Sequence, residues 1–506
     1  MSKKELVINN SKLFWLFTFD FLKLPKKSLR VISKQIAEST LVQGWSYYYT
    51  PDERHLGIGK IEAKEDHNDA SSTDPFYQSK EILEILQSTD FLVLDEEFFE
   101  AQIFTRFHLK GFKVRLPDIE NPQDVSVALM LTKWGVGCLG FYIDLNVDLS
   151  ASQLASLQII PKDEEPILRA QLDIELIQEI SYMNPDVKDI VDKRKAAGKK
   201  DVLFKQVSLG EIVWFYIASM INLIHDRGFK SFEEITDKQR YETYIAHPLV
   251  IIEKTEPEYQ SAYELVKNHR EEIYIIAEQL PHLERDDVSS YTSRKLLRSI
   301  ITDREDIWYY MTIGSTIQII TPRTREIAES KSENGSNEYY KEILQPYVEN
   351  EVIQIQRFII LMMEHFISSQ DIAELKPREI SFLKESVMKS LEIFYTIRIS
   401  GNSISHARIE LGKEVTLVNN VQKAIEEKIV LLEGAVRDYQ ESLKDFTQAI
   451  LGVILGVVPA ILFLFSGTND MIKLILSVVL SGGLTLLARY GARYYWKMKQ
   501  KKESYV

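Results

Sequence analysis

The amino-acid sequence predicts an α+β cytosolic region, followed by long α-helices and a C-terminal two-helix transmembrane hairpin. Three observations lead to this fold class. Strand-like runs rich in aromatic and β-branched residues alternate with helical patterns up to about residue 336. Beyond that point the apolar residues keep helical spacing almost throughout. Two long apolar runs then precede a basic tail.

The first segment, residues 1–165, is expected to form an N-terminal α/β domain. Leu13–Leu22 is dense in aromatic residues and predicts the first strand. Val125–Thr132 and Cys138–Leu145 are apolar runs on either side of a glycine-containing turn, a pattern typical of a β-hairpin. A helix is expected to begin at Ser150.

Residues 166–336 predict a second α/β region. Gly210–Ile224 is apolar on one broad face, which predicts a helix packed in a core. His247–Glu253 and Ile307–Thr321 supply strand candidates, and a glycine offers a turn within the second. Lys331–Asn337 is the clearest linker in the chain, so we place a domain boundary there.

Residues 337–445 predict a stalk of long helices. One keeps helical spacing from Leu344 to Phe366, and a second runs from about Pro377 to Ile399. A third, from about residue 415 to 465, carries an apolar seam with charged flanks, as in a coiled coil. The seam alternates spacings of four and three: Ile425, Ile429, Leu432, Val436, Tyr439, Leu443 and Phe446. It predicts packing with partner chains; the alternative is packing within its own chain, against the helix at 344–366.

Residues 446–490 hold the two predicted transmembrane helices. Phe446–Phe465 is uncharged and Met471–Ala488 carries one charge, so each run is near the roughly 20 residues that a helix needs to cross hydrocarbon. The tail at 491–506 is basic, whereas the turn between the runs is nearly neutral. By the positive-inside tendency we expect a multi-pass protein of the cell (inner) membrane with both termini cytoplasmic.

The composition argues against several classes of function. The net charge of −13 disfavours nucleic acid as a main partner. Cys138 is the only cysteine, so neither an internal disulfide nor a thiolate zinc site is expected. The nine histidines are scattered without ligand spacing, and no phosphate loop or nucleophile elbow is complete. We therefore expect no catalytic residues, no resident cofactor and no enzymatic activity.

The hairpin carries the functional signal of the sequence. Two helices cannot enclose a pore, so conduction requires several copies around an axis, with one span of each copy lining it. Because the seam enters the first span, the predicted lining is a hydrophobic bore made by Leu443, Phe446, Ile450, Val453, Val457, Ala460 and Leu464. The predicted mouth consists of Gly467, Thr468, Asn469 and Asp470. Close helix packing is expected at Gly452, Gly456, Gly482 and Gly483. The alternative is that the mouth residues merely favour a turn.

This arrangement resembles the CorA superfamily of cation channels over about residues 337–506. The resemblance is carried by the end of the first span and by the tail: Gly467, Thr468, Asn469 and the basic residues from Arg489 onward. It implies a homopentamer, with Asn469 at the selectivity mouth facing a hydrated divalent cation such as Mg²⁺, as permeant or regulator. Two features depart from the family. Thr468 stands where Met is usual, and Lys473 opposes the concentration of cations, so magnesium transport does not follow directly.

Three functions remain open from the sequence. The first is an oligomeric CorA-like ion channel or transporter for divalent cations, gated by its large cytosolic sensor domain. The second is an antiphage effector, like the CorA-like proteins of type III CRISPR systems, that a nucleotide second messenger opens. The third is a membrane-tethered scaffold without a pore. The expected partners are the membrane, further copies of the chain, divalent cations and a nucleotide signalling molecule.

Overall fold

The structure, a computed structural model, describes much of the chain before residue 432. The described ranges are 5–20, 29–50, 53–58, 78–94, 104–161, 168–174, 176–177, 185–224, 244–294, 296, 304–331, 335–368 and 402–431. Single residues or pairs between 380 and 391 and between 433 and 448 are also described. Statements below refer to these residues.

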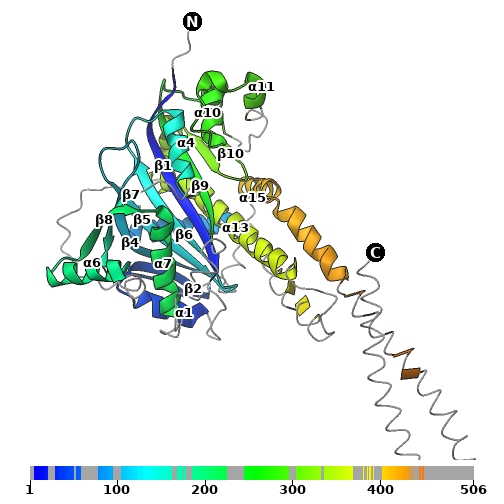
Figure 1. The fold of residues 1–506 in the computed structure, drawn as a ribbon. Coiled ribbons are helices and arrows are strands. Elements are labelled where there is room, and N and C mark those ends of the chain that lie inside the picture. Colours follow the sequence, from blue (N-terminus) through cyan, green and yellow to red (C-terminus); the bar gives the residue numbers. More distant parts are fainter. Residues whose placement is uncertain are drawn as a thin grey trace, which may run out of the picture. The chain divides into compact units, whose positions relative to one another are not determined.

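Eleven strands form one mixed sheet (Figure 1). They are β1 (Val7–Asp20), β2 (Val42–Thr50), β3 (Glu53–Ile58), β4 (Phe104–Arg115), β5 (Gln123–Thr132), β6 (Val136–Leu145), β7 (Leu168–Asp173), β8 (Asp201–Val207), β9 (Tyr244–Glu256), β10 (Ile307–Met311) and β11 (Thr316–Ile320). Their order is β10-β11-β9-β1-β6-β5-β4-β2-β3, and β7 joins β4 to β8. Only β9 and β11 pair in parallel among these described strands.

The described helices lie between and after the strands. They are α1 (Leu29–Ala37), α2 (Ser79–Val93), α4 (Ala151–Ile159), α6 (Pro185–Ala196), α7 (Leu209–Ile224), α9 (Ala262–Asn268), α10 (Arg270–Ala277), α11 (Ser290–Ser293), α12 (Pro322–Lys331), α13 (Gly335–Ser368) and α15 (Ser403–Val415), with a 3-10 turn at Arg285–Asp287. Local sequence explains several starts. Ser150 and Gln153 form a reciprocal capping box before α4, and Asn402 accepts two backbone N–H groups before α15.

Aromatic side chains of β1 show that both faces of the sheet are covered. Phe17 packs on Phe141 of β6, which in turn packs on Tyr216 of α7. Phe14, on the opposite face, lies 5.0 Å from Tyr142 and 5.2 Å from Tyr347 of α13, measured between ring centroids. Because successive side chains of a strand point to opposite faces, α7 and α13 cover different sides of the sheet (Figure 1). The main hydrophobic core lies on the α7 side, where α1, α4 and α10 also pack.

The chain divides into two compact units. The first comprises Met1–Ile359 and Ile393–Val418, and the second comprises Ile360–Glu392 and Asn419–Val506. One boundary falls inside α13, which continues unbroken from the first unit into the second. The other falls just after α15, at Val418.

Several predicted elements are confirmed. The first strand is β1, and the predicted hairpin is β5–β6, with Gly135 at a left-handed φ of 83° in its turn. The hairpin at 307–321 is β10–β11, and the apolar helix at 210–224 is α7. The helical spacing from 344 to 366 belongs to α13.

The predicted fold class is wrong in its arrangement. We expected an α+β region, long helices and a CorA-like transmembrane hairpin, whereas the structure is a mixed α/β protein built on one sheet. Strands from both expected α/β regions join in it, because β9 pairs along most of β1. β1 is buried on both faces and needs a neighbouring strand at each edge. The sequence pattern predicts the strand but not which strands pair with it.

The predicted placement in a cell membrane is also corrected. Within the described ranges no helix combines the length and the apolar character of a membrane span. α7 is apolar but has 16 residues, and α13 has 34 residues but carries charged and amide side chains along its length. The structure therefore gives a multi-pass assignment no support. Of the two predicted spans, 446–465 and 471–488, the structure describes only Thr447 and Gln448.

Candidate functional site

The site residues predicted from the sequence lie outside the described part of the chain. This holds for the predicted mouth, the predicted pore lining from Leu443 onward and the four packing glycines. The first two seam residues are described: Ile425 is 0 % exposed and Ile429 is 6 % exposed, both within the chain itself. For these two residues the structure favours the alternative that the seam packs within its own chain.

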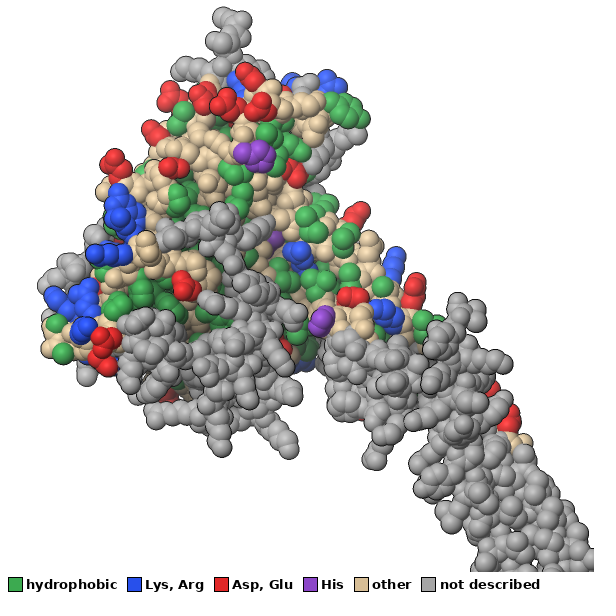
Figure 2. Space-filling model, viewed as in Figure 1, with side chains coloured by type: hydrophobic (Ala, Val, Ile, Leu, Met, Phe, Trp, Pro, Cys, Tyr) green, Lys and Arg blue, Asp and Glu red, His purple; other side chains and the backbone are tan. Residues whose placement is uncertain are grey.

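On the face shown in Figure 2, acidic side chains gather toward the top of the view and basic side chains gather at the left, with hydrophobic side chains scattered between them. Among the described residues, no group of three or more His, Cys, Asp or Glu side chains is arranged to hold a metal ion. The unusual chemistry lies in the interior, between α13 and the sheet.

Buried polar side chains are concentrated on α13. We call them the polar layer: Gln345, Glu349, Asn350, Glu351, Gln354 and Gln356, which are all buried, five of them fully. Carboxylates and amides are seldom fully buried unless they are paired, because burial removes their hydration. The partners of this layer come from β4, β11 and α15, and α2 is joined to it through Arg106 of β4.

One cluster of the polar layer joins three buried charged side chains. Arg106 of β4 donates from Nε to Asp90 Oδ2 at 2.8 Å and from Nη2 to Asp90 Oδ1 at 2.6 Å. The same Nη2 lies 2.7 Å from Glu351 Oε2. The three side chains are at most 3 % exposed. One guanidinium therefore ties α2 and α13 to the sheet.

The charges of this cluster do not cancel if both carboxyls are ionised. Asp90 forms a two-bond pair with Arg106, whereas Glu351 contacts it through one oxygen. Burial raises the pKa of both carboxyls, and Arg106 opposes this at each. Because Glu351 has the poorer contact with Arg106, we expect it to be the carboxyl that keeps a proton, and the cluster is then neutral.

A second cluster ties α15 to α13. Glu349 Oε1 accepts from Ser405 Oγ at 2.8 Å and from Gln345 Nε2 at 2.9 Å. Its Oε2 lies 3.5 Å from Arg408 Nη1. The Arg408 guanidinium also lies 4.7 Å from the ring centroid of Tyr309, within the range of a cation–π contact. Burial raises the pKa of Glu349, with Arg408 opposing it.

A third set of bonds compensates a proline inside α13. Pro346 has no N–H to donate to the carbonyl of Glu342, and Gln318 of β11 donates to that carbonyl instead, at 3.0 Å. Asn350 Nδ2 donates to the Pro346 carbonyl at 2.7 Å and its Oδ1 accepts from Thr316. The sheet therefore supplies hydrogen bonds that keep α13 continuous through Pro346.

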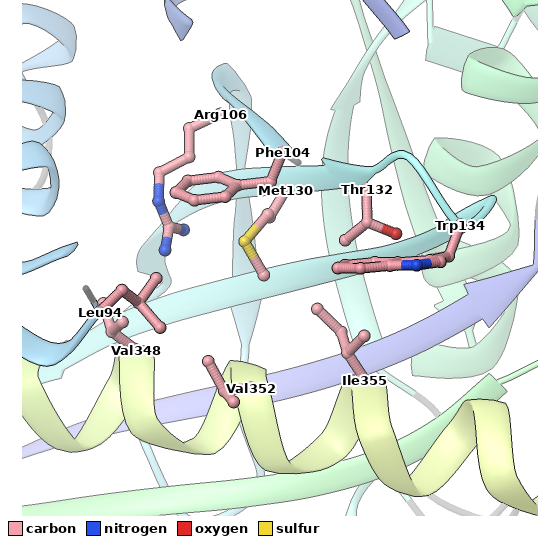
Figure 3. Close-up of a pocket in the computed structure, with 9 residues that line it drawn as sticks. All are labelled: Leu94, Phe104, Arg106, Met130, Thr132, Trp134, Val348, Val352 and Ile355. Atoms are coloured by element: carbon pink, nitrogen blue, oxygen red, sulfur yellow. The ribbon is translucent and has the colours of Figure 1, made fainter. Parts of the chain in front are cut away.

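Small cavities accompany the polar layer. One of about 10 Å³ lies beside Arg106, between β4, β5 and α13 (Figure 3), and one of about 20 Å³ lies beside Tyr347. In Figure 3, Val348, Val352 and Ile355 of α13 face Met130, Thr132 and Trp134 across the first cavity. Each has room for about one water molecule, far less than the roughly 300 Å³ of a small-molecule site.

The sequence contains a signal for this site in the polar residues that lie within apolar segments. The spacing of the apolar residues alone does not reveal it. Arg106 interrupts the strand between Phe104 and Phe107, and the stretch around Glu349–Gln356 is polar within a helix expected to be buried. A charge inside an apolar strand together with carboxylates inside a buried helix indicates an ion cluster between the two.

Comparison with models of known families, with characterised proteins and with solved structures gave no match for this chain.

Proposed function

We propose that this chain is a regulatory protein in which the sheet body controls the helical unit that begins at Ile360. α13 is the coupling element. Its first part is bonded to the sheet through the polar layer, and its last part belongs to the second unit.

The continuity of α13 is the observation that carries this proposal. An unbroken helix moves as a rigid element, so a displacement on the sheet is transmitted along it. In the Arg106 cluster the first part of α13 is held by the ion pair between Arg106 of β4 and Glu351, and Arg106 is itself held by two hydrogen bonds to Asp90. A change in the charge of this cluster is therefore expected to reach residues 360–368.

What the helical unit does when it is controlled stays a prediction from the sequence. Conduction of divalent cations, opening by a nucleotide second messenger and a pore-free scaffold depend on residues outside the described part of the chain. The resemblance to the CorA superfamily stays a prediction for the same reason. The cation channel and the nucleotide-opened effector both require a sensor domain that acts on the C-terminal helices. We propose that this action passes through α13.

The test is hydrogen exchange measured by mass spectrometry on the full-length chain. Arg106→Met removes the central cation, and Glu351→Gln keeps the shape while removing the extra charge. We expect exchange in 360–368 and 418–431 to change by about tenfold, which corresponds to about 1.4 kcal/mol of opening free energy.

Arg115→Met is the matched control, because Arg115 lies on the same strand and is exposed. It should leave exchange in both segments unchanged. If Glu351→Gln alters exchange in 335–359 while 360–368 and 418–431 keep their wild-type rates, α13 does not couple the units and the proposal fails. Glu351→Gln decides the matter should Arg106→Met not fold.

A further inference from the structure

The chain breaks its helix between α15 and residue 418 without a helix-breaking residue. α15 ends at Val415, Thr416 and Leu417 form a turn, and the helix resumes at 418 and is described to 431. The stretch from 413 to 433 contains neither glycine nor proline. Local sequence therefore contains no strong helix breaker here.

Leu417 has a backbone conformation that leucine rarely adopts. Its φ is +62°, in the left-handed region, where a β-carbon clashes with the following carbonyl. The position after a helix C-cap is usually glycine for this reason. The Leu417 side chain is 47 % exposed, so its burial does little to offset the strain.

Contacts on α15 explain why the strain persists. Ser405 and Arg408 bond to Glu349, as described above, and Gly412 packs so closely on α13 that a β-carbon would overlap Ile353 Cδ1. At its end, Thr416 donates from N and from Oγ1 to the Gly412 carbonyl, at 2.9 and 2.6 Å. The direction of α15 is thus fixed by these contacts with α13, which we call its seat on α13.

The helix that follows is fixed by other contacts, within the second unit. Ile425 and Ile429 are buried there, and Lys428 donates to Ser368 Oγ at 2.8 Å. Two helices that are each held by their own contacts are joined by one residue pair. The boundary between the compact units falls one residue after that pair, between Val418 and Asn419.

We propose that Thr416–Leu417 is a strained hinge that becomes helical when α15 leaves its seat on α13. α15 and the helix at 418–431 then form one continuous helix, and Leu417 returns to the right-handed region. This inference goes beyond the proposed function, because it assigns a moving element and a second conformation that do not depend on α13 transmitting a signal.

The test is a distance measured by pulsed electron paramagnetic resonance in the full-length chain. Spin labels are attached at Ala407→Cys and Ala424→Cys, two exposed positions, and the native Cys138 is fully buried and stays unlabelled. In a continuous helix the two Cα atoms are about 26 Å apart, since each residue rises about 1.5 Å. A chain that turns at Leu417 gives a different distance.

Leu417→Gly and Leu417→Ala form a matched pair, because both remove the side chain but only alanine keeps the β-carbon. We expect the population at about 26 Å to be about five- to thirtyfold smaller with glycine than with alanine, the ratio for about 1–2 kcal/mol of left-handed strain. Gly412→Ala crowds the contact of α15 with Ile353, and we expect it to enlarge that population.

Two results would overturn the hinge. One is a single distance, different from that of the continuous helix, that is the same in the wild type, in both Leu417 variants and in Gly412→Ala. The other is a population at about 26 Å that does not differ between the glycine and alanine variants. The circular dichroism of each variant shows whether it is folded, so a loss of structure is recognised and not counted as straightening.

Discussion

At the scale of single residues, Arg106 and Glu351 define what is unusual about this protein. Moving charges out of water is costly, and a buried ion pair recovers that cost only when its geometry is good. Asp90 and Arg106 have such geometry, with two bonds of 2.6 and 2.8 Å. Glu351 is the additional carboxyl, so its protonation state sets the net charge beneath α13.

Glu351 is predicted to make stability depend on pH. Its pKa is raised from 4.5 in the folded state, so the folded protein keeps a proton that the unfolded chain releases as pH rises above that value. Stability then falls with rising pH, by up to about 1.4 kcal/mol per unit, until the folded pKa is reached. Glu351→Gln cannot release a proton and should lose this part of the slope. Urea unfolding between about pH 5 and about pH 8 measures it.

The exposed Glu329 provides the control for this experiment. No buried charge is involved there, so Glu329→Gln should keep the wild-type slope. Equal slopes for the wild type and Glu351→Gln would show that Glu351 does not hold the proton.

At the scale of elements, α13 is a helix whose continuity depends on the sheet. Gln318 and Asn350 bond to the carbonyls around Pro346, and Gly140 of β6 allows Tyr347 to approach the sheet. A β-carbon at Gly140 would overlap the Tyr347 hydroxyl oxygen. The seat of α13 is therefore determined by close fit as well as by charge.

Gly140→Ala is predicted to destabilise the protein by about 1–3 kcal/mol, the usual cost of overpacking a core. Tyr347→Phe removes the nearest atom and should recover part of the loss, so the two changes are not additive. Chemical denaturation of the four members of this cycle provides the measurement. Gly434→Ala, where nothing lies within 4 Å of an added β-carbon, should not destabilise. Strict additivity would mean that Tyr347 does not limit the space at Gly140.

At the scale of the whole molecule, one sheet unites distant parts of the chain. β1 lies between β6 and β9, and the parallel partner of β9 is β11. On the α7 side, the sheet is covered by α1 and by helices that follow residue 150, including α4, α7 and α10. Residues 5–320 of the described chain therefore contribute to a common core.

A fragment of residues 1–165 is predicted not to fold cooperatively alone. It would lack β9 at one edge of β1 and α7 on one face, leaving an apolar edge and an apolar surface exposed. Coexpression with residues 166–506 should restore solubility, because the complementary strand and helix are then present. Solubility and thermal unfolding of the fragment, alone and with its complement, are the measurements. A soluble fragment with a sharp transition would show that the first six strands are self-sufficient.

The sequence by itself determined the elements that depend on neighbouring residues. Aromatic and β-branched content predicted β1, a glycine-containing turn predicted the β5–β6 hairpin, and periodic apolar residues predicted α7 and α13. These features follow from backbone preference and from burial on one face, which a short window of sequence records.

Only the tertiary structure decided which elements meet. Pairing of β1 with β9 and burial of Arg106 against Glu351 join residues more than 200 positions apart, and no local pattern encodes such a choice of partner. The break at Leu417 is the opposite case, since the local sequence contains no strong helix breaker and long-range contacts oppose a continuous helix. In each case the deciding free energy comes from contacts between distant segments, which exist only once the chain is folded.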